Sequence, residues 1–164
     1  MTARVRKASE ADISAITDIY NEAIRDTTAT FDTEPKTVEE RLQWLRSHDN
    51  RHPVLVLDSG GIVLGWVSLS AWSERQAYSG TAEITYYVAA GARGQGFGRM
   101  LQDAIVEEAE RQRFHTLIAR ITAGNEISVR LCESSGFEHV GTMKEVGRKF
   151  GELLDVHVLQ KMLG

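Results

Sequence analysis

The sequence contains little cysteine and no excess of positive charge. One cysteine, Cys132, occurs among 164 residues, which excludes an internal disulfide framework and favours a reducing cytoplasm. The chain has 19 Lys and Arg against 23 Asp and Glu, a formal net charge of −4. A broad nucleic-acid-binding surface would carry clustered basic residues in excess. We therefore expect a cytoplasmic protein whose partner is not nucleic acid.

Long apolar runs and metal-binding motifs are also missing. The longest apolar-leaning stretch, residues 62–72, is too short to cross a membrane and is interrupted by glycine and serine. The opening Met-Thr-Ala-Arg-Val-Arg-Lys does not resemble a signal peptide. The histidines occur without a His-Glu-x-x-His or Cys-x-x-Cys motif. The sequence thus predicts no membrane insertion and no bound metal.

The length and the patterning predict a single domain over residues 1–164. A chain of this length buries about 70% of the surface that its unfolded form exposes, and no repeat, linker or second domain is visible in it. Residues 9–12 and 37–40 resemble capping boxes, each ahead of apolar residues at helical spacing. They predict two helices, with Phe31 in the loop between them.

Runs of β-forming residues alternate with helical segments over the rest of the chain. Residues 2–7 alternate as an edge strand does, and Asp-Ser-Gly-Gly at 58–61 predicts a hairpin between the runs 53–57 and 62–71. The further predicted strands cover residues 81–88, 116–121, 138–146 and 155–162, and the further predicted helices cover residues 98–113 and 125–135. This order predicts an α/β fold whose sheet begins antiparallel and becomes mixed.

A glycine-rich hexapeptide lies where a predicted strand gives way to a predicted helix. Residues 93–98 read Arg-Gly-Gln-Gly-Phe-Gly. Glycine at every second position lets successive backbone N–H groups turn inward, and the following helix adds the positive end of its dipole. The segment is typical of a phosphate-binding loop, although a plain strand-to-helix turn would also explain the hexapeptide taken alone.

Known families of phosphate-binding loop can be compared with this segment. A Walker loop would end in Gly-Lys-Ser or Gly-Lys-Thr, which the chain lacks, and a dinucleotide fingerprint that began at Gly94 would need glycine in place of Arg99. The spacing Arg93-x-x-Gly96-x-Gly98 resembles the Q/R-x-x-G-x-G/A loop of the GNAT acetyltransferase superfamily. In that family the pyrophosphate of acetyl-CoA binds the loop amides.

Motifs on both sides of the last predicted helix extend the resemblance. Asn125-x-x-Ser128 and Ser-Gly-Phe at 135–137 are similar to the second half of the GNAT acetyl-CoA site. Residues 146–156 and Gln160 resemble the C-terminal part of the phosphinothricin acetyltransferase-like branch. Members of this branch acetylate phosphinothricin, methionine sulfoximine and methionine sulfone. The chain resembles the branch over nearly its whole length.

The resemblance implies an α/β (α+β) GNAT fold. Its mixed, mostly antiparallel sheet would be splayed between the fourth and fifth strands, and acetyl-CoA would lie in that gap as co-substrate. The cofactor-binding residues that the resemblance implies are Val88, Ala89, Ala90, Arg93, Gly94, Gln95, Gly96, Phe97, Gly98, Arg99, Asn125 and Ser128. From the sequence alone, Asn125 also suits a plain helix N-cap, and the two arginines suit solvated charges at the rim of the loop.

Glu83 is the candidate general base. An amine must lose its proton before it attacks a thioester, and for an α-amine with a pKa of about 8 this costs about 1–2 kcal/mol at neutral pH, within reach of one carboxylate. On the sequence alone, a glutamate in a strand more often faces solvent. The resemblance implies the catalytic role, because Glu83 matches the glutamate of the Val-Glu-x-Ser-Val-Tyr-Val strand of the branch.

The other reacting groups have weaker signals. A backbone N–H near Val88, at the splayed end of the strand, is the expected donor to the tetrahedral oxyanion. Many GNAT enzymes place Tyr, and this branch often places His, where this sequence has Cys132. Two interpretations of Cys132 stay open, a general acid or an inert buried residue, and we favour the second. Tyr86, Tyr87 or water would then protonate the departing thiolate.

A substrate of this branch carries a carboxylate, which an arginine would bind in bidentate fashion. Arg75 is the nearest candidate, but relatives often show Trp followed directly by Arg where this chain reads Trp-Ser-Glu-Arg, so surface charge is the alternative. The resemblance also places Phe31, Thr85 and Lys149 at the substrate, Lys149 from the same chain or from a second subunit. Glu-Leu at 152–153 replaces the Arg-Trp of the family, which predicts a changed substrate preference.

Together these features predict an acetyl-CoA-dependent N-acetyltransferase. The acetyl group would pass directly, in a ternary complex, to the α-amine of a small amino-acid-like substrate. The resemblance further implies a homodimer. Two alternatives stay open: a GNAT enzyme that acetylates a peptide or protein amine, and a CoA-binding sensor domain without turnover. The sequence does not define the physiological amine.

Overall fold

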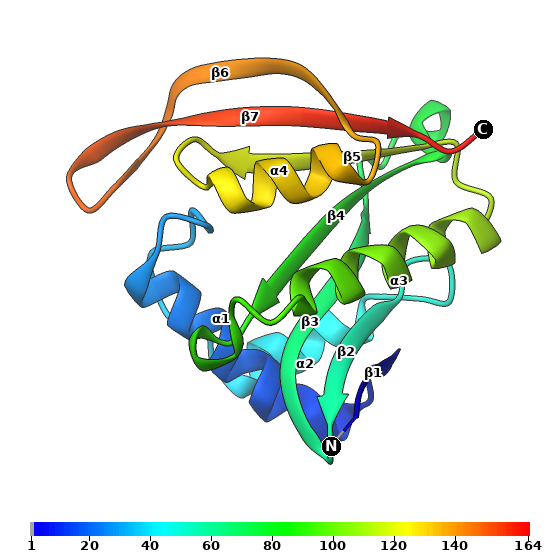
Figure 1. Ribbon diagram of the computed structural model, residues 1–164, viewed down its shortest axis with the longest axis vertical. Coiled ribbons are helices and arrows are strands. Elements are labelled where there is room, and N and C mark those ends of the chain that lie inside the picture. Colours follow the sequence, from blue (N-terminus) through cyan, green and yellow to red (C-terminus); the bar gives the residue numbers. More distant parts are fainter. Residues whose placement is uncertain (1) are drawn as a thin grey trace.

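The computed structural model describes residues 2–164 as one mixed sheet with helices packed on both faces (Figure 1). The strands follow the spatial order β1-β2-β3-β4-β5-β7-β6, and every neighbouring pair is antiparallel except β4–β5. The strands are β1 Ala3–Lys7, β2 Val54–Ser59, β3 Ile62–Ala71, β4 Thr81–Val88, β5 Thr116–Thr122, β6 Glu138–Lys149 and β7 Glu152–Met162. The helices are α1 Ile13–Asp26, α2 Val38–Arg46, α3 Phe97–Arg111 and α4 Glu126–Ser134. The predicted order of elements and the α/β class are confirmed.

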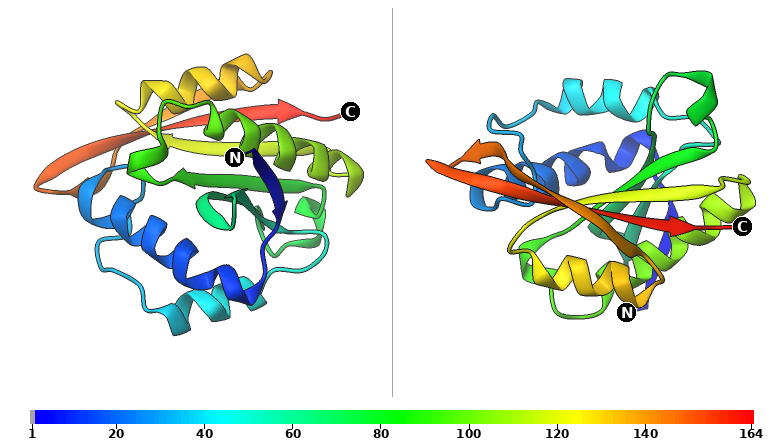
Figure 2. Two further views of the ribbon diagram at one scale, coloured as in Figure 1. Left: turned by 60° about the horizontal axis from the view of Figure 1, so that its bottom comes forward. Right: turned by 90° about the horizontal axis from the view of Figure 1, so that it is seen from above.

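The helices form two layers around the sheet (Figure 2). α1 and α2 lie on one face, and α3 and α4 lie on the other. Because side chains alternate along a strand, Leu55 and Leu57 of β2 join the core under α3, while Val54 and Val56 join the core under α1. This burial on both faces explains why β2 is apolar at successive positions. None of the helices within residues 2–164 is long and apolar enough to cross a membrane.

The sheet opens between its fourth and fifth strands. β4 pairs with β5 only over residues 81–83, which face residues 116–118. Beyond Glu83, β4 stays paired with β3 as far as Val88, whereas β5 follows β7 along its whole length. Figure 1 shows the two strands diverging from this point. The splayed sheet implied by the resemblance is confirmed.

Several boundaries differ from the prediction. α3 ends at Arg111 and not at residue 113, because Arg113 has a left-handed backbone (φ 61°) that an α-helix does not contain. The last two strands are longer than predicted and meet in a tight hairpin at Phe150 (φ 51°) and Gly151 (φ 77°). The sequence did not predict this hairpin. Gly147 and Gly151 lie in the missed region, and glycine has a low strand propensity.

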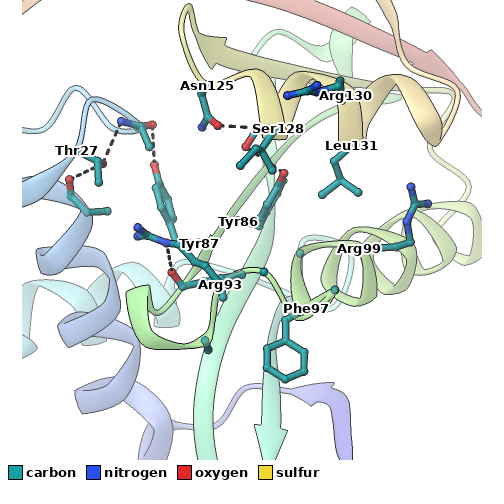
Figure 3. A pocket seen from close by; sticks show the side chains of 18 of the residues that line it. Thr27, Tyr86, Tyr87, Arg93, Phe97, Arg99, Asn125, Ser128, Arg130 and Leu131 are labelled. Carbon is teal, nitrogen blue, oxygen red and sulfur yellow. Dashed lines mark hydrogen bonds between the residues drawn. The ribbon is translucent and has the colours of Figure 1, made fainter.

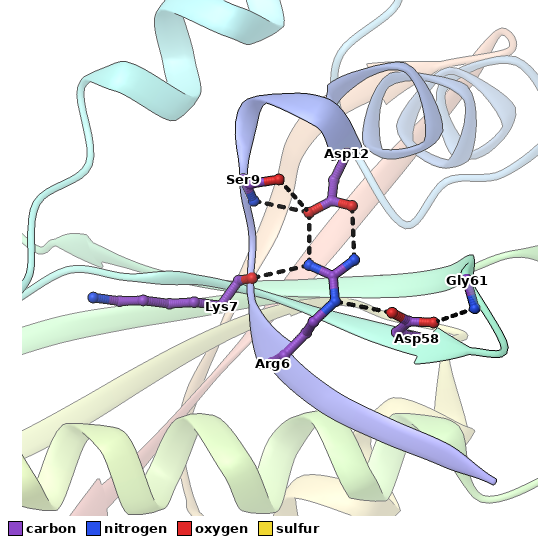
Figure 4. A network of polar contacts seen from close by, with 6 residues as sticks. All are labelled: Arg6, Lys7, Ser9, Asp12, Asp58 and Gly61. Atoms are coloured by element: carbon purple, nitrogen blue, oxygen red, sulfur yellow. Dashed lines mark hydrogen bonds and ion pairs between the residues drawn. The ribbon is translucent and has the colours of Figure 1, made fainter.

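Arg6 connects the edge strand β1 to two other elements through hydrogen bonds (Figure 4). Its guanidinium donates to both carboxylate oxygens of Asp12, each at 2.9 Å, and to Asp58 at 2.9 Å. Asp12 precedes α1 and also accepts from the Ser9 amide at 2.8 Å. Asp58 ends β2 and accepts from the Gly61 amide at 2.7 Å. One arginine thus joins β1, the start of α1 and the β2–β3 turn.

Candidate active site

Two cavities meet at the gap between β4 and β5. The first, of about 880 Å³, lies at the N-terminus of α3, and we call it the α3 cavity (Figure 3). The second, of about 500 Å³, lies beside β5 and the loop between α1 and α2, and we call it the β5 cavity. The residues that line both are Ala29, Tyr86, Tyr87, Asn125 and Ser128. Ligands in the two cavities would therefore meet at a common wall.

The glycine loop forms one side of the α3 cavity. Gly94 (φ 78°) and Gly96 (φ 82°) have left-handed backbones, and Gly96 is the N-cap of α3. A Cβ at either position would meet nothing within 4 Å, so glycine is needed here for its conformation and not for space. The first N–H groups of the helix have no acceptor inside the helix, and the helix dipole makes this end positive. The loop is therefore built to bind an anion.

Three arginines add positive charge to the α3 cavity (Figure 3). Arg93, Arg99 and Arg130 line it, and no acidic residue of the described chain does so. Arg93 Nε donates to the Val88 carbonyl at 3.3 Å, and Arg99 donates to the Ser134 hydroxyl. A guanidinium has more donors than these contacts use. The cavity thus fits a ligand with several phosphate charges, as a CoA ester has.

Three of the predicted cofactor-binding residues do not line the α3 cavity: Ala89, Ala90 and Gln95. The Ala89 amide continues the sheet by donating to the Leu64 carbonyl at 2.9 Å, and the Ala90 amide donates to Glu22 Oε1 at 2.7 Å. Gln95 is exposed. The amides of both alanines are thus already paired within the protein, which the sequence pattern did not indicate.

The remaining predicted residues of the CoA side lie along the cavity wall. Gly98 packs closely, since a Cβ there would come within 3.3 Å of Leu131. Phe97 contributes its backbone, because its ring packs against the core and points away from the other labelled side chains (Figure 3). Asn125 caps α4 by accepting from the Ser128 amide at 3.3 Å, and it lines both cavities. The N-cap interpretation and a position at the ligand therefore coexist.

Backbone N–H groups of β4 face the gap. Hydrogen bonds from Trp72 to Thr81 (3.4 Å) and from Ala89 to Leu64 (2.9 Å) mark the hydrogen-bonded pairs at the two ends of the β3–β4 ladder. Hydrogen-bonded and free pairs alternate along antiparallel strands, so the Val88 amide points away from β3. β5 has already diverged there, and the N–H is available to a carbonyl oxygen in the gap.

Glu83 lies in the β5 cavity and forms an ion pair with Arg120. Arg120 Nε and Nη2 donate to the two carboxylate oxygens at 2.5 and 2.8 Å. The Glu83 side chain is 16% exposed and that of Arg120 is 50% exposed. The hydrogen bonds to Glu83 raise the pKa of Arg120. Within the described chain, these two residues supply the formal charges of this cavity, one of each sign.

Arg120 was not predicted as a site residue. Its signal in the sequence is one charged residue within the otherwise uncharged strand Thr-Leu-Ile-Ala-Arg-Ile-Thr at 116–122. Such a charge shows that one position of the strand is not buried in the core, but it does not say which partner lies opposite. The pairing of β5 with the start of β4 supplies that partner. Arg130 was missed as well, because an arginine on a short amphipathic helix has no distinctive pattern.

The predicted substrate residues divide into two groups. Phe31 and Thr85 line the β5 cavity, and the Phe31 ring lies directly over Gly147 of β6. Lys149 is buried and lines neither cavity, because its Nζ donates to the Thr30 carbonyl at 2.8 Å and so ties the α1–α2 loop to β6. Burial lowers the pKa of Lys149. Arg75 is exposed in the β3–β4 connection and also lines neither cavity.

Cys132 and Tyr86 are two of the predicted candidates for a general acid, and both line the β5 cavity. Cys132 is fully buried, its Sγ donates to Gln102 Oε1 at 3.5 Å, and burial raises its pKa to about 12. Tyr86 lines both cavities and donates to the Ser128 hydroxyl at 3.3 Å, and burial raises its pKa to about 12. Both groups keep their protons at neutral pH, but the Tyr86 hydroxyl lies at the common wall of the two cavities.

An anion-binding glycine loop beside a splayed strand, next to a cavity with one carboxylate, defines an acyltransferase that takes its acyl group from a CoA ester. The model of the acetyltransferase (GNAT) domain matches residues 5–158. The chain belongs to the GNAT acetyltransferase family.

Similar proteins cover this chain almost completely. An L-methionine sulfoximine/L-methionine sulfone acetyltransferase of Pseudomonas aeruginosa is 38% identical over 98% of this chain and 94% of its own. The solved structure of a phosphinothricin acetyltransferase from Sinorhizobium meliloti in complex with acetyl-CoA is 34% identical, with a TM-score of 0.93, over 100% of this chain and 90% of its own. That of a ribosomal-protein-alanine N-acetyltransferase from Brucella melitensis is 42% identical, with a TM-score of 0.93, over 96% of this chain and 98% of its own.

Proposed function

We propose that this acetyltransferase passes the acetyl group of acetyl-CoA directly to the α-amine of a small amino-acid-like substrate. Phosphinothricin, methionine sulfoximine and methionine sulfone are the kinds of substrate for which its relatives are named. The observation that carries the proposal is the meeting of the two cavities at Tyr86 and Tyr87. One cavity is positive and suits phosphates, and the other holds the carboxylate of Glu83.

Bound acetyl-CoA supplies the acetyl group as a thioester. The amides of residues 94–99, with Arg93 and Arg99, hold the pyrophosphate at the start of α3. Arg130 faces the same cavity and adds a third positive charge. The Val88 N–H donates to the carbonyl oxygen of the thioester and stabilises the negative charge that develops on it.

Glu83 removes the proton from the substrate ammonium. One N–H bond breaks, the proton moves to a carboxylate oxygen of Glu83, and the lone pair left on nitrogen attacks the carbonyl carbon. Because an α-ammonium has a pKa of about 8, the required shift is small and a single carboxylate suffices. Glu83 is less exposed than most surface carboxylates, and it opens into the cavity where the amine would lie.

The C–S bond then breaks, Tyr86 donates a proton to the departing thiolate, and the second proton that leaves the nitrogen restores the Tyr86 hydroxyl. Its hydroxyl lies at the common wall, and its raised pKa keeps the proton in place until the sulfur becomes negative. Cys132 lines only the β5 cavity, where its side chain is fully buried and its S–H is directed at Gln102. We therefore assign Cys132 to the core and retain the inert interpretation.

A homodimer and a cytoplasmic location remain predictions. Apolar side chains of the β6–β7 hairpin favour a homodimer, since Val140, Val146, Phe150 and Leu153 are each about half exposed or more. An exposed apolar surface of this kind is typical of a subunit interface. Light scattering of the purified protein at two concentrations measures the mass directly.

A second candidate is acetylation of a peptide or protein amine. The 42% identical relative from Brucella melitensis is named for the alanine of a ribosomal protein, which favours this alternative. The two candidates differ in what flanks the amine. A free amino acid carries a carboxylate two bonds from its nitrogen, whereas a peptide carries an uncharged amide at that position.

The experiment is a CoA thiol release assay with acetyl-CoA and a panel of amines. The panel contains phosphinothricin, methionine sulfoximine, methionine sulfone, the common amino acids and peptides with an N-terminal alanine, and acetyl-CoA binding is measured in parallel. Turnover with a free amino acid or analogue supports the proposal. Turnover with peptides alone supports the second candidate. Binding of acetyl-CoA without turnover of any amine would support a CoA-binding sensor and contradict both.

A further inference from the structure

The β5 cavity contains one ion pair whose two charges match the two charges of an amino acid. Glu83 and Arg120 supply one negative and one positive charge, and the other lining residues of the described chain are uncharged. A free amino acid at neutral pH carries an ammonium and a carboxylate on the same carbon atom. The ammonium would lie at Glu83 and the carboxylate at Arg120, so each charge of the ligand would meet its opposite.

The Arg120 guanidinium has donors to spare for such a carboxylate. Nε and one proton of Nη2 bind Glu83, which leaves Nη1 and the second Nη2 proton free. The side chain is 50% exposed, and its Cζ lies 5.5 Å from the centroid of the Trp72 ring. The aromatic face limits the positions of the guanidinium on that side. Because the Arg120 side chain is half exposed and lines the cavity, a ligand in the cavity can reach its guanidinium.

The other cationic candidates are unsuited to this task. Arg75 is exposed and lies outside the cavity lining, and Lys149 is buried with its Nζ on the Thr30 carbonyl. The three arginines of the α3 cavity lie at the glycine loop and α4, on the side of the phosphates. Arg120 is the cation that shares a cavity with the proposed base.

We propose that Arg120 binds the α-carboxylate of the substrate amino acid and that this contact frees Glu83 to act as the base. The inference rests on the proposed function, because it assigns the specificity of that same site. In the free protein both carboxylate oxygens of Glu83 accept from Arg120. When Arg120 turns toward the substrate carboxylate, a carboxylate oxygen of Glu83 becomes free to accept the ammonium proton. Binding of a zwitterion and activation of the base are thus one event.

This arrangement also explains how the site would reject peptides. A peptide or an amino acid amide has no carboxylate to draw Arg120 away, so its amine would compete with a bidentate guanidinium for Glu83. A charge-assisted hydrogen bond is worth about 1.5–3 kcal/mol, which corresponds to about 10- to 100-fold in affinity. The discrimination between an amino acid and its amide is therefore the property that Arg120 controls.

The test compares the fastest amino acid of the amine panel with its α-carboxamide. Values of kcat and KM are measured for wild type, Arg120→Gln and Arg120→Lys. Arg111→Gln is the matched control, because Arg111 forms an arginine–glutamate pair with Glu108 at 2.7 Å on the surface of α3, outside both cavities.

Wild type should prefer the acid, and Arg120→Gln should lower kcat/KM for the acid about 10²-fold, mainly through KM, while kcat/KM for the amide should rise, because its amine no longer competes with the guanidinium for Glu83. Arg120→Lys should restore part of the preference, and Arg111→Gln should keep all of it. Equal losses on acid and amide would overturn the inference and leave Arg120 as a positioning residue of Glu83. So would a preference for the acid that persists in Arg120→Gln. A wild-type protein that acetylates only peptides would overturn the proposed function itself, and this result appears before any variant is made.

Discussion

At the scale of single residues, the proposed chemistry depends on which polar side chains line the two cavities. Glu83 and Tyr86 belong to the same strand but point to opposite faces of it, as side chains separated by three positions do. The gap opens between β4 and β5, so both side chains line the cavity beside it. Cys132 stands at the family's acid position and also lines the β5 cavity, yet its side chain is fully buried and its S–H is directed at Gln102. We propose Tyr86 as the acid because of its position, since Tyr86 lines both cavities and Cys132 lines only the β5 cavity.

Replacing the two candidate acids separately tests this assignment. Cys132→Ala should lower kcat less than tenfold, with a loss of about 1–2 kcal/mol in unfolding free energy from the small cavity it leaves. Tyr86→Phe should lower kcat by about 10²-fold, because it removes the proton donor but keeps the ring. Steady-state CoA release and a thermal melt of each variant give both quantities. A larger kcat loss in Cys132→Ala than in Tyr86→Phe would reverse the assignment.

The sequence predicted the residues whose role rests on local chemistry. The glycines of the 93–98 loop need their backbone freedom and the helix that follows them, and both can be recognised from consecutive residues. Arg120 could not be found in this way, because its partner Glu83 lies 37 residues away in sequence and meets it only through strand pairing. Arg75 and Lys149 were placed at the substrate by resemblance alone. Neither lines the cavity, since one is at the surface and the other is engaged by Thr30.

At the scale of elements, the long β6–β7 hairpin at the edge of the sheet forms part of the wall of the β5 cavity. Gly147 of β6 lies so close to the Phe31 ring that a Cβ there would overlap it. Two contacts thus hold the loop between α1 and α2 against β6. The Phe31 ring packs on Gly147, and Lys149 Nζ donates a hydrogen bond to the Thr30 carbonyl. This hairpin was underestimated from the sequence, because contacts made across more than a hundred residues, and not strand propensity, stabilise its glycine-rich part.

Gly147→Ala tests whether the position of Phe31 matters to the substrate. The added methyl group must displace the ring, since the neighbouring atoms belong to one side chain of a loop. We expect KM for the amine to rise about tenfold while the Kd of acetyl-CoA stays within about twofold, as the α3 cavity is untouched. Gly141→Ala on the same strand is the control, because a Cβ there meets nothing within 4 Å. Equal KM values in the two variants would remove Phe31 from the substrate site.

At the scale of the whole molecule, two charge networks lie in separate parts of the sheet. The Arg6 network lies at the β1 edge of the sheet (Figure 4). The Glu83–Arg120 pair lies at the gap between β4 and β5. Hydrogen bonds from Arg6 hold the pKa values of Asp12 and Asp58 below their usual range. A lowered carboxyl pKa contributes stability that is complete above the unfolded-state pKa and is lost as pH falls through the folded-state pKa.

The free energy of unfolding of the wild type should therefore fall as pH drops below about 4, the usual carboxyl range. Arg6→Met should lower Tm at neutral pH by about 5 °C, because it leaves two buried carboxylates without their partner, and its stability should depend less on acid pH. Arg46→Met is the control, since the Arg46–Glu10 pair is more than half exposed on both sides and should hardly affect Tm. Identical acid profiles for wild type and Arg6→Met would contradict this account.

The most direct measurement of the central claim is the rate of CoA release by Glu83→Gln with the best amine of the panel. Glutamine still accepts a hydrogen bond from Arg120, so the side chain should stay in place while its basicity is lost. Glu107→Gln, which changes an exposed partner of Arg111 at 3.3 Å, is the matched control. We predict that Glu83→Gln lowers kcat by about 10²-fold or more, with an unchanged Kd for acetyl-CoA and a normal rate for Glu107→Gln. Equal rates for Glu83→Gln and wild type would show that Glu83 is not the base.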